Sequence, residues 1–554
     1  MKNEELTQMY RSLDQDLTHL YDQLNSRRDF EEILFLPTDE NVAQARADWQ
    51  TLKDRAEALD APDPVYALLK NHFQDFLDSL QFTIDGAEAS PAGAMLDYVS
   101  WLQEIIRCDR RPDSVRRDLL QHRLEAFGEY QDIYSELIQT RNADSLNALS
   151  RSLLRTKADV EREISYLKSY FPDMADAELA PLNQAMSDFC TQLTAMVGDI
   201  GNASEEAQAD ALKDDLSIRV ALPKEAYRNL LKKRLGVSLD ELLSWYQEEV
   251  VKTRAEVFRI AADLDIEETA PTTMKEVSDI LFRYAGPCSS AEEMFDRANY
   301  YLKRTRAVAH EYVRLPEDEA CVCVPLPEFF KDGYPWGGYE GGDFSIRPFH
   351  GQMFLNQYNY NNITDGWIKL NAMHESYPGH HVQYVRSAID ATPDTVKLGA
   401  KNVPILEGTC LRTERAFQFI FAEDPFFPLF VAFRRHHTSV RILVDLQLFY
   451  FGATLEEAIQ IYEKELGFDR VTARTQVRAH QSSPGYFTCY YYGMKKLCDW
   501  EKEYGYTKWD YTELLFSAGQ ISMESLGMLV RMTKEEQERY FHEFGSSRLI
   551  NPRF

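Results

Sequence analysis

The chain has 554 residues, of which 44% are hydrophobic and 27% charged, and this composition excludes a disordered protein. Its formal net charge of −28 repels phosphate backbones and anionic membrane surfaces, so we expect neither nucleic acid nor a membrane as a partner. The length predicts two parts, an N-terminal helical half (residues 1–265) and a second half (residues 266–554), unless they form one continuous helical domain.

The cysteines and the N-terminus indicate the cellular compartment. The 8 cysteines are scattered and include no CxxC pair, which favours free thiols in a reducing environment. The first residues contain no apolar signal region, and no stretch approaches the roughly 20 apolar residues that span a bilayer. These features predict a cytoplasmic protein.

Residues 1–265 show the three-and-four spacing of apolar side chains that is typical of amphipathic helices. Examples are residues 17–24, 94–107 and 230–264. Pro-containing segments at residues 61–64 and 171–173 predict breaks between helices. We therefore expect a mainly α fold.

A short β region follows near residues 318–360. Cys321–Pro325 is predicted to be a strand, the glycine-rich Tyr334–Gly342 a loop, and Gln352–Tyr358 a second strand. Such a sheet either braces a junction or presents an edge to an extended peptide, and the residues leave both open.

Helices are predicted again after residue 365. Thr454 and Glu457 form a capping-box pattern at the start of one of them. The predicted helices are Trp367–Ile389, Ile405–Phe421, residues 429–451, Tyr486–Tyr504 and two more within residues 512–545.

Three histidines lie within eight residues beside a glutamate, in His374-Glu375-Ser-Tyr-Pro-Gly-His380-His381. Clustered histidines with an acidic neighbour are typical of a metal site, where the glutamate activates a water. The usual two-histidine helix needs its second histidine four residues on, and that position holds Pro378. Pro378 and the glycine after it predict a bulge that brings His380 or His381 towards His374. The helical phase slightly favours His381.

A second helix is expected to supply the third metal ligand. Glu407 and Glu414 are seven residues apart, so they share one helix face. One carboxylate could bind the metal while the other accepts a hydrogen bond from a ligand histidine.

A Pro-Gly turn opens a tyrosine-rich helix further along the chain. A phenol such as Tyr490 can donate a hydrogen bond to the oxyanion that forms when water attacks a carbonyl. His480, or the histidine left over from the first motif, is a further candidate for this role. Arg412 and Arg478 are candidates for clamping a substrate carboxylate.

Four motifs occur in one order in the second half of the chain. They are His374-Glu-Ser-Tyr-Pro-Gly-His-His381, Glu407-Gly with Glu414, Arg441-Ile-Leu-Val-Asp445, and Pro484-Gly485 followed by Tyr490 and Gly493. Together they resemble the bacterial domain-of-unknown-function family numbered 885, over roughly residues 250–545. That family is similar to a distant branch of the gluzincin metallopeptidases, near angiotensin-converting enzyme and the thimet-oligopeptidase group.

The resemblance implies a large multi-helix fold with a deep central cleft, and a metal-binding catalytic half at residues 266–554. It implies a hydrolase with one Zn²⁺ per chain, oligopeptidase- or carboxypeptidase-like, that cleaves peptide or amide bonds of short substrates. By position, its metal ligands are His374, one of His380 and His381, and Glu407, with Glu375 as general base, Tyr490 as hydrogen-bond donor, and Glu414 and Asp445 as supporting residues.

This chain departs from the family's usual residues at four places near the motifs, namely Thr409, Arg412, Phe449 and Tyr486. These departures leave the substrate open. Two other functions also remain: non-haem iron or other metal-assisted chemistry, for which histidines and carboxylates with open positions are equally suited, and a catalytically inactive binding protein.

Overall fold

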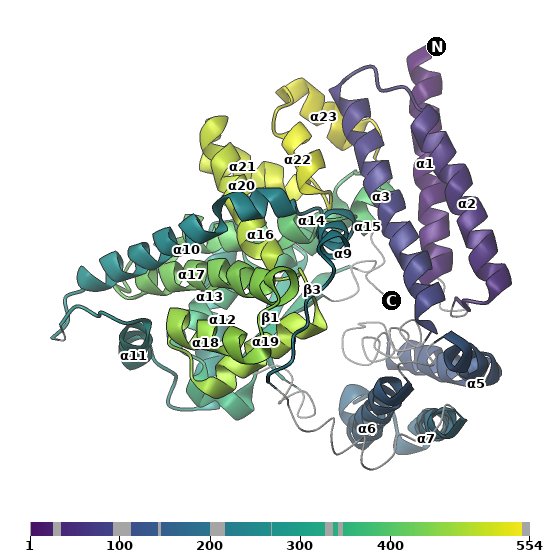
Figure 1. The fold of residues 1–554 in the computed structure, drawn as a ribbon, viewed down its shortest axis with the longest axis horizontal. Coiled ribbons are helices and arrows are strands. Elements are labelled where there is room, and N and C mark those ends of the chain that lie inside the picture. The colour runs from purple at the N-terminus through teal and green to yellow at the C-terminus, as the bar shows by residue number, and fades with distance from the viewer. Residues whose placement is uncertain are drawn as a thin grey trace.

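Helices make up most of the chain, and one small sheet interrupts them (Figure 1). The structure is a computed structural model that describes residues 2–25, 35–91, 112–141, 146–199, 216–267, 269–326, 336–341 and 347–545. The predicted fold class, mainly α with a small sheet near residues 318–360, is confirmed. None of the helices in these ranges is both long and apolar enough to cross a membrane.

Three long helices form the N-terminal end of the molecule, drawn in purple in Figure 1. Their apolar faces meet where Tyr10 contacts Tyr66, with ring centroids 4.9 Å apart. The break predicted at residues 61–64 is confirmed, because the Asp63 side chain caps the third helix by accepting hydrogen bonds from two of its first backbone N–H groups. The helices are α1 (Lys2–Asn25), α2 (Asp39–Ala58) and α3 (Pro64–Ala89).

The next three helices bury an apolar cluster of their own. Phe127 and Phe189 pack edge to face at its centre, with ring centroids 4.8 Å apart. The break predicted at residues 171–173 separates the second helix from the third, and the helix predicted at residues 94–107 lies outside the described residues. These helices are α5 (Asp113–Arg141), α6 (Leu146–Tyr170) and α7 (Asp176–Asp199).

From residue 224 onwards the chain forms many further helices, most of them shorter. The capping box predicted at Thr454 and Glu457 is confirmed. The segment at residues 230–264 is divided by Gly236, whose φ of 67° ends a π-helical turn, and residues 508–542 form three helices rather than two. The helices are α9 (Lys224–Asn229), α10 (Leu239–Ala262), α11 (Met274–Tyr284), α12 (Ala291–Ala309), α13 (Asp365–Asn371), α14 (His380–Ile389), α15 (Asp394–Leu398), α16 (Val403–Ala416), α17 (Phe427–Leu446), α18 (Leu455–Leu466), α19 (Arg470–Ser482), α20 (Thr488–Glu503), α21 (Lys508–Ser517), α22 (Met523–Leu529) and α23 (Lys534–His542).

The largest apolar cluster joins the N-terminal helices to the C-terminal half. It contains Leu69 and Phe76 of α3 together with Tyr511 of α21 and Leu526 of α22. A second cluster surrounds the sheet and the segment that carries the histidine motif. The division at residues 265 and 266 stays a prediction, and the largest cluster draws on both sides of it.

Two glycines set the distance between α16 and α20. A Cβ atom at Gly408 would lie 2.6 Å from the backbone carbon of Gly493, and one at Gly493 would lie 1.9 Å from the carbonyl oxygen of Pro404. The two backbones can therefore touch only because neither position carries a side chain. This close approach brings Glu407 of α16 and Tyr490 of α20 to one cavity.

The sheet has three strands in the order β1-β3-β2, with β1 parallel and β2 antiparallel to the central β3. The bounds are β1 (Glu319–Pro325), β2 (Gly337–Gly341) and β3 (Phe349–Leu355). β2 corrects the prediction of a loop at Tyr334–Gly342, of which residues 336–341 are described. Its three glycines carry no strand propensity, and it is held by pairing with β3.

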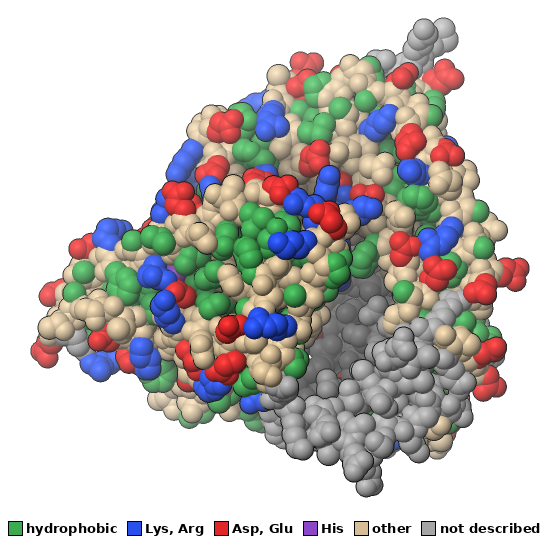
Figure 2. Space-filling model, viewed as in Figure 1, with side chains coloured by type: hydrophobic (Ala, Val, Ile, Leu, Met, Phe, Trp, Pro, Cys, Tyr) green, Lys and Arg blue, Asp and Glu red, His purple; other side chains and the backbone are tan. Residues whose placement is uncertain are grey.

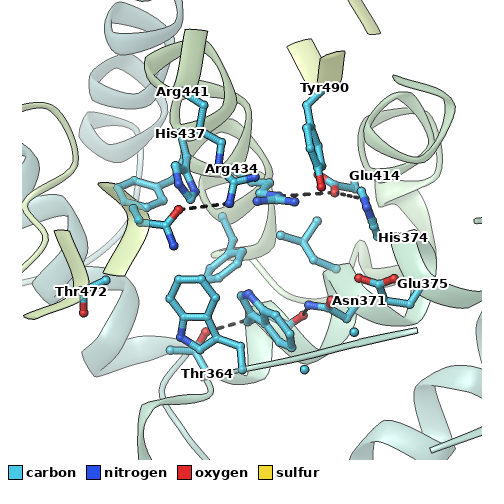
Figure 3. Close-up of a pocket in the computed structure, with 18 of the residues that line it drawn as sticks. Thr364, Asn371, His374, Glu375, Glu414, Arg434, His437, Arg441, Thr472 and Tyr490 are labelled. Atoms are coloured by element: carbon cyan, nitrogen blue, oxygen red, sulfur yellow. Dashed lines mark hydrogen bonds and ion pairs between the residues drawn. The ribbon is translucent and has the colours of Figure 1, made fainter. Parts of the chain in front are cut away.

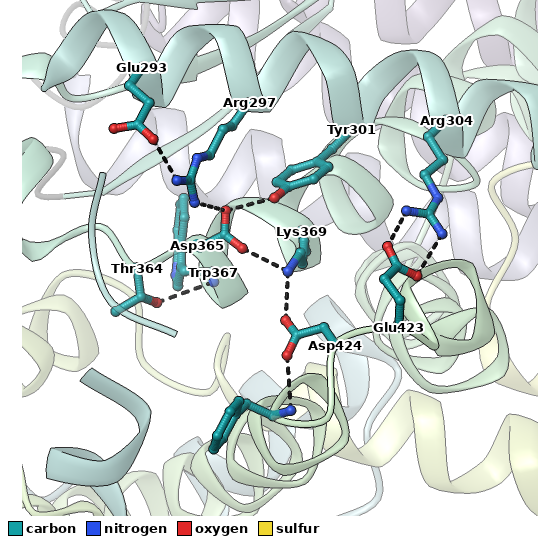
Figure 4. Close-up of polar contacts among 11 residues, drawn as sticks. Glu293, Arg297, Tyr301, Arg304, Thr364, Asp365, Trp367, Lys369, Glu423 and Asp424 are labelled. Atoms are coloured by element: carbon teal, nitrogen blue, oxygen red, sulfur yellow. Dashed lines mark hydrogen bonds and ion pairs between the residues drawn. The ribbon is translucent and has the colours of Figure 1, made fainter. Parts of the chain in front are cut away.

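A buried ionic network holds α13, the helix that leads into the histidine motif (Figure 4). The Lys369 ammonium lies 2.7 Å from the Asp365 carboxylate and 2.6 Å from that of Asp424. Asp365 also accepts hydrogen bonds from Arg297 and Tyr301 of α12. Removing one member would leave a buried charge unpaired, so this network fixes α13 against α12 and the start of α17.

Acidic and basic side chains are interspersed on the face of the molecule shown in Figure 2, with apolar side chains between them. The net charge of −28 is therefore not gathered into one acidic block on this face. Interspersed charges of this kind favour solubility rather than a particular partner.

The stability of the folded chain is expected to depend on His72 of α3 below neutral pH. His72 is fully buried, and burial lowers its pKa from 6.5 to about 4. Because the unfolded chain then binds a proton that the folded chain does not, stability falls as the pH drops from about 6.5 towards 4. Between pH 7 and pH 5 the wild type should lose about 2 kcal/mol more than the His72→Leu variant, measured by urea unfolding.

Replacement of the exposed His19 by leucine is the control for this experiment, and it should leave the pH dependence of the wild type unchanged. An identical pH dependence in the wild type and in His72→Leu would contradict the assignment.

Candidate metal centre

The histidine motif folds as two helical pieces with a break between them. α13 continues into a π-helical turn, Ala372–Ser376, and the chain then becomes extended at Tyr377, where φ is −132° and ψ is 116°. Gly379 allows the chain to fold back, since a Cβ atom there would lie 2.0 Å from the carbonyl oxygen of His374. α14 then begins at His380.

The break places His380, and not His381, beside His374. The two rings are 5.0 Å apart between centroids and nearly perpendicular, at 83°. The phase argument that favoured His381 assumed one continuous helix, and it is wrong because the extended residue resets the helical phase.

His381 points away from this pair and joins the sheet to α14. It is fully buried, with Nε2 2.7 Å from the Glu319 carboxylate of β1 and Nδ1 3.0 Å from the Tyr339 hydroxyl of β2. Glu319 also accepts a hydrogen bond from the Tyr377 hydroxyl at 2.7 Å. The sheet thus braces the start of α14. The sequence did not identify Glu319 as a residue that holds this region.

The two glutamates of α16 both reach His374. Glu414 Oε1 lies 2.8 Å from His374 Nδ1, so it can orient the ring, and Glu407 Oε2 lies 3.4 Å from Nε2. The same Glu407 oxygen lies 3.5 Å from Nε2 of His380. The structure therefore brings together His374, His380, Glu407 and Glu414.

The Glu407 oxygen between the two histidines is the strongest sign of a metal position. Glu407 Oε2 is buried and has no hydrogen-bond partner among the described residues, whereas Oε1 accepts a hydrogen bond from the Tyr486 hydroxyl at 2.7 Å. Two donor atoms bound to one tetrahedral Zn²⁺ at its usual bond lengths lie about 3.4 Å apart. The Glu407–His374 and Glu407–His380 distances match that separation.

Cys410, one helical turn after Glu407, offers a different third donor. Possible ligand atoms of His374, His380 and Cys410 all lie within 4.8 Å of one another. Burial raises the pKa of the Cys410 thiol well above its usual value, and the carboxylate of Glu407 raises it further. Cys410 Sγ lies beside Nδ1 of His380, at 3.5 Å, whereas Glu407 Oε2 lies beside Nε2 of both histidines, so we favour Glu407.

The electrostatics around His374 are dominated by carboxylates. Burial lowers the pKa of His374, but the carboxylates of Glu407 and Glu414 raise it by more, to about 10. Burial likewise raises the pKa of Glu407, but His380 and His374 bring it well below its usual value. Glu375 adds a third carboxylate, half-buried and facing the cavity (Figure 3). A cation would be stabilised by this surplus of negative charge.

Tyr486 lies in the turn that precedes α20, and Tyr490 lies in the first turn of that helix. The Tyr490 ring stacks on His374, with centroids 6.4 Å apart and planes 10° apart. Its hydroxyl lies 3.2 Å from that of Tyr486. Burial raises the pKa of Tyr490, so its phenol stays protonated and can donate a hydrogen bond.

His480 and Asp445 do not lie where the sequence placed them. His480 is buried, with Nδ1 2.8 Å from Asp445 Oδ2 and Nε2 2.8 Å from the Tyr462 hydroxyl, and it does not line the cavity. Asp445 supports no candidate metal ligand: it accepts hydrogen bonds from the Tyr227 hydroxyl and from the backbone N–H of Gly485. Both residues therefore hold the turn that carries Tyr486 and leads into α20. This contact corrects the predictions that His480 takes part in catalysis and that Asp445 supports the metal ligands.

The candidate metal residues line a cavity of about 1030 Å³, enough for a short peptide. Figure 3 shows His374, Glu375 and Glu414 on one side of it and Arg434, His437 and Arg441 of α17 on another. The remaining walls include Trp336 to Tyr339 around β2, Asn371 of α13, and Thr472 and Gln476 of α19.

Neither of the two arginines proposed as carboxylate clamps lines the cavity. Arg412 is buried and forms an ion pair with Glu501, and Arg478 is exposed on α19. Arg434 and Arg441 occupy the cavity wall instead. The only sign of these two arginines in the sequence is their seven-residue spacing, which places them on one face of a helix that also has an apolar face.

Of the four altered positions, only Tyr486 lines the cavity. Thr409 and Phe449 are buried elsewhere, and Phe449 stacks on Tyr227 with ring centroids 6.1 Å apart. Among these four positions, therefore, Tyr486 alone contacts the candidate metal residues, through its hydrogen bond to Glu407.

A family model described as "Bacterial protein of unknown function (DUF885)" matches residues 22–508. No curated protein matches the chain. A "putative lipoprotein" from Colwellia psychrerythraea has a similar structure, with a TM-score of 0.68 and 17% identity over 95% of this chain and 98% of that chain. One from Shewanella oneidensis has a TM-score of 0.66 and 14% identity, over 95% of this chain and 100% of that chain. At these identities the likeness concerns the fold alone.

Proposed function

The chain belongs to the bacterial family of unknown function DUF885, and we propose that it is a zinc-dependent hydrolase that cleaves peptide or amide bonds of short substrates. The observation that carries the proposal is the buried Glu407 Oε2, which has no hydrogen-bond partner and faces Nε2 of both His374 and His380. A buried carboxylate oxygen that accepts no hydrogen bond is costly unless a cation lies beside it. Two imidazoles and a carboxylate suit one Zn²⁺ per chain.

The residues around this position suit hydrolysis. When bound, the metal lowers the pKa of a water and polarises a carbonyl. Glu375 accepts the proton of the attacking water and returns it to the leaving amine, so that water adds across the C–N bond and yields a carboxylate and an amine. The Tyr490 phenol donates a hydrogen bond to the carbonyl oxygen as negative charge develops there.

Glu375 supports catalysis over a purely binding role. It is half-buried at the cavity wall, and within the described part of the chain no hydrogen bond or ion pair engages its carboxylate. A carboxylate held free beside a metal position is suited to proton transfer, whereas a binding protein needs no such group.

A second function shares the same donors. Two histidines and one carboxylate also form the facial triad of non-haem iron enzymes, so the geometry of His374, His380 and Glu407 is compatible with iron. The nature of the metal therefore decides between hydrolysis and oxidation.

Elemental analysis of protein purified without added metal tests the proposal. We expect about one zinc per chain, lost in His374→Ala and kept in the control His19→Ala, together with hydrolysis of short peptides or amides by the wild type. Iron in place of zinc would direct the search to oxidative chemistry. The absence of any metal, even after incubation with zinc, would refute the proposal. The cytoplasmic location stays a prediction.

A further inference from the structure

The cavity wall opposite Glu375 carries positive charge, although the protein as a whole is strongly acidic (Figure 3). Arg434, His437 and Arg441 are three and four residues apart on α17, so they share one face of the helix, and all three line the cavity. Buried charges are normally paired, so the partners of these two arginines indicate what this wall binds.

Arg441 has no acidic partner among the described residues. Its side chain is 7% exposed, Nη2 donates a hydrogen bond to the amide oxygen of Gln476 at 3.1 Å, and Nε is buried without a partner. The guanidinium lies beside the rings of Phe487 and Tyr490, with Cζ 4.7 and 5.2 Å from their centroids. Aromatic rings and an amide oxygen do not neutralise a buried cation, so this site favours an anion from outside the chain.

Arg434 adds a second charge to the same wall. Its Nε lies 3.6 Å from Glu414, too far for a strong hydrogen bond, and its Cζ lies 6.0 Å from the Tyr490 ring. Burial lowers the pKa of His437 well below its usual value, and the charges of Arg441 and Arg434 lower it further. His437 is therefore neutral, and its buried Nε2, which lacks a partner, is a further polar group at this wall.

This positive wall lies close to the candidate metal position. The Tyr490 ring is 6.4 Å from the His374 ring and 5.2 Å from Arg441 Cζ. These two contacts allow at most about 12 Å between His374 and the guanidinium, the span of three or four extended residues. An anionic group bound by Arg441 therefore belongs to a residue near the bond being cleaved.

We propose that Arg441, assisted by Arg434, binds a carboxylate of the substrate within a few residues of the scissile bond, either the C-terminal carboxylate or an acidic side chain. A planar guanidinium matches a carboxylate through two parallel hydrogen bonds, which fixes the substrate in register as well as holding it. The inference rests on the proposed function, since that function places the scissile bond beside His374.

Binding of three related peptides tests this subsite without requiring turnover. The peptides are N-acetylated Ala-Phe-Ala as the free acid, the same peptide as its C-terminal amide, and the amide of N-acetylated Ala-Phe-Glu. Calorimetry on the Glu375→Gln variant is expected to show that the free acid, the Glu-containing amide, or both bind at least tenfold more tightly than the neutral amide. Tight binding of the free acid would identify the C-terminal carboxylate as the bound group, and tight binding of the Glu-containing amide would identify an acidic side chain.

The Arg441→Gln variant in the same background should abolish this preference and leave the affinity for the neutral amide unchanged. Arg435→Gln is the matched control, because Arg435 lies on the same helix but pairs with Glu256 at 2.8 Å. Should Arg441→Gln fail to fold, Arg434→Gln is expected to reduce the preference at least threefold.

Equal affinity for the three peptides, no binding of any of them, or a preference that survives the arginine replacements would overturn the subsite. Because binding is measured without turnover, a protein that prefers carboxylates but hydrolyses nothing would contradict the proposed function alone.

Discussion

Replacement of Glu375 by glutamine should lower the turnover of a peptide substrate by about 10²- to 10⁴-fold. Glutamine has nearly the same shape as glutamate but cannot accept the proton of the attacking water. Glu375 is half-buried and has no partner in the described part of the chain, so its loss should leave the fold and the metal content intact. Steady-state kinetics, metal analysis and thermal unfolding of the purified variant measure these three quantities.

The control for this experiment is Glu248→Gln, an exposed position on α10 that is remote from the cavity lining and should keep wild-type activity. Turnover by Glu375→Gln within a few-fold of the wild type would show that another group takes the proton. Loss of metal in this variant would instead make Glu375 a ligand.

Single replacements of His380 and His381 by glutamine should differ strongly in their effect on zinc affinity. His380→Gln removes a donor that lies 3.5 Å from Glu407, so we expect zinc affinity to fall by at least 100-fold, more than the loss of a supporting residue usually causes. His381→Gln leaves that position intact and should change zinc affinity by less than about threefold. Competition with a chelating dye measures both affinities.

For the free energy of unfolding we expect the reverse, with His381→Gln destabilised more than His380→Gln. His381 is fully buried against the fully buried Glu319, and its removal weakens the pairing of a buried carboxylate, with an expected cost of about 3 kcal/mol in the free energy of unfolding. His380 is partly exposed at the cavity wall, so His380→Gln should cost less. If His381→Gln lost its zinc while His380→Gln kept it, the metal would lie on the other side of the motif.

Most helices could be predicted because their signal is local. The breaks before Pro64 and after Tyr170 and the capping box at Thr454 follow from a few neighbouring residues, and the structure has them. β2 could not be predicted this way, because its glycines form a strand only where β3 supplies hydrogen-bond partners.

The candidate site was predicted in part, and its errors arise where tertiary structure decides which side chain faces the cavity. Glu414 beside His374 followed from the spacing on one helix. The slight preference for His381 failed because Tyr377 is extended, and the roles given to His480 and Asp445 failed because both lie behind the turn at Gly485. A residue's phase along one helix is fixed by the sequence, but its phase across a break is not.

The sequence by itself determined the helical class and indicated His374, Glu375 and Glu407 as candidate chemistry. The tertiary structure alone decided that His380 lies beside His374 and that Arg441 lines the same cavity without an acidic partner among the described residues. The reason is physical: helical periodicity acts over a few residues, whereas the relative position of α16, α17 and α20 depends on side-chain packing and on the contact of Gly408 with Gly493.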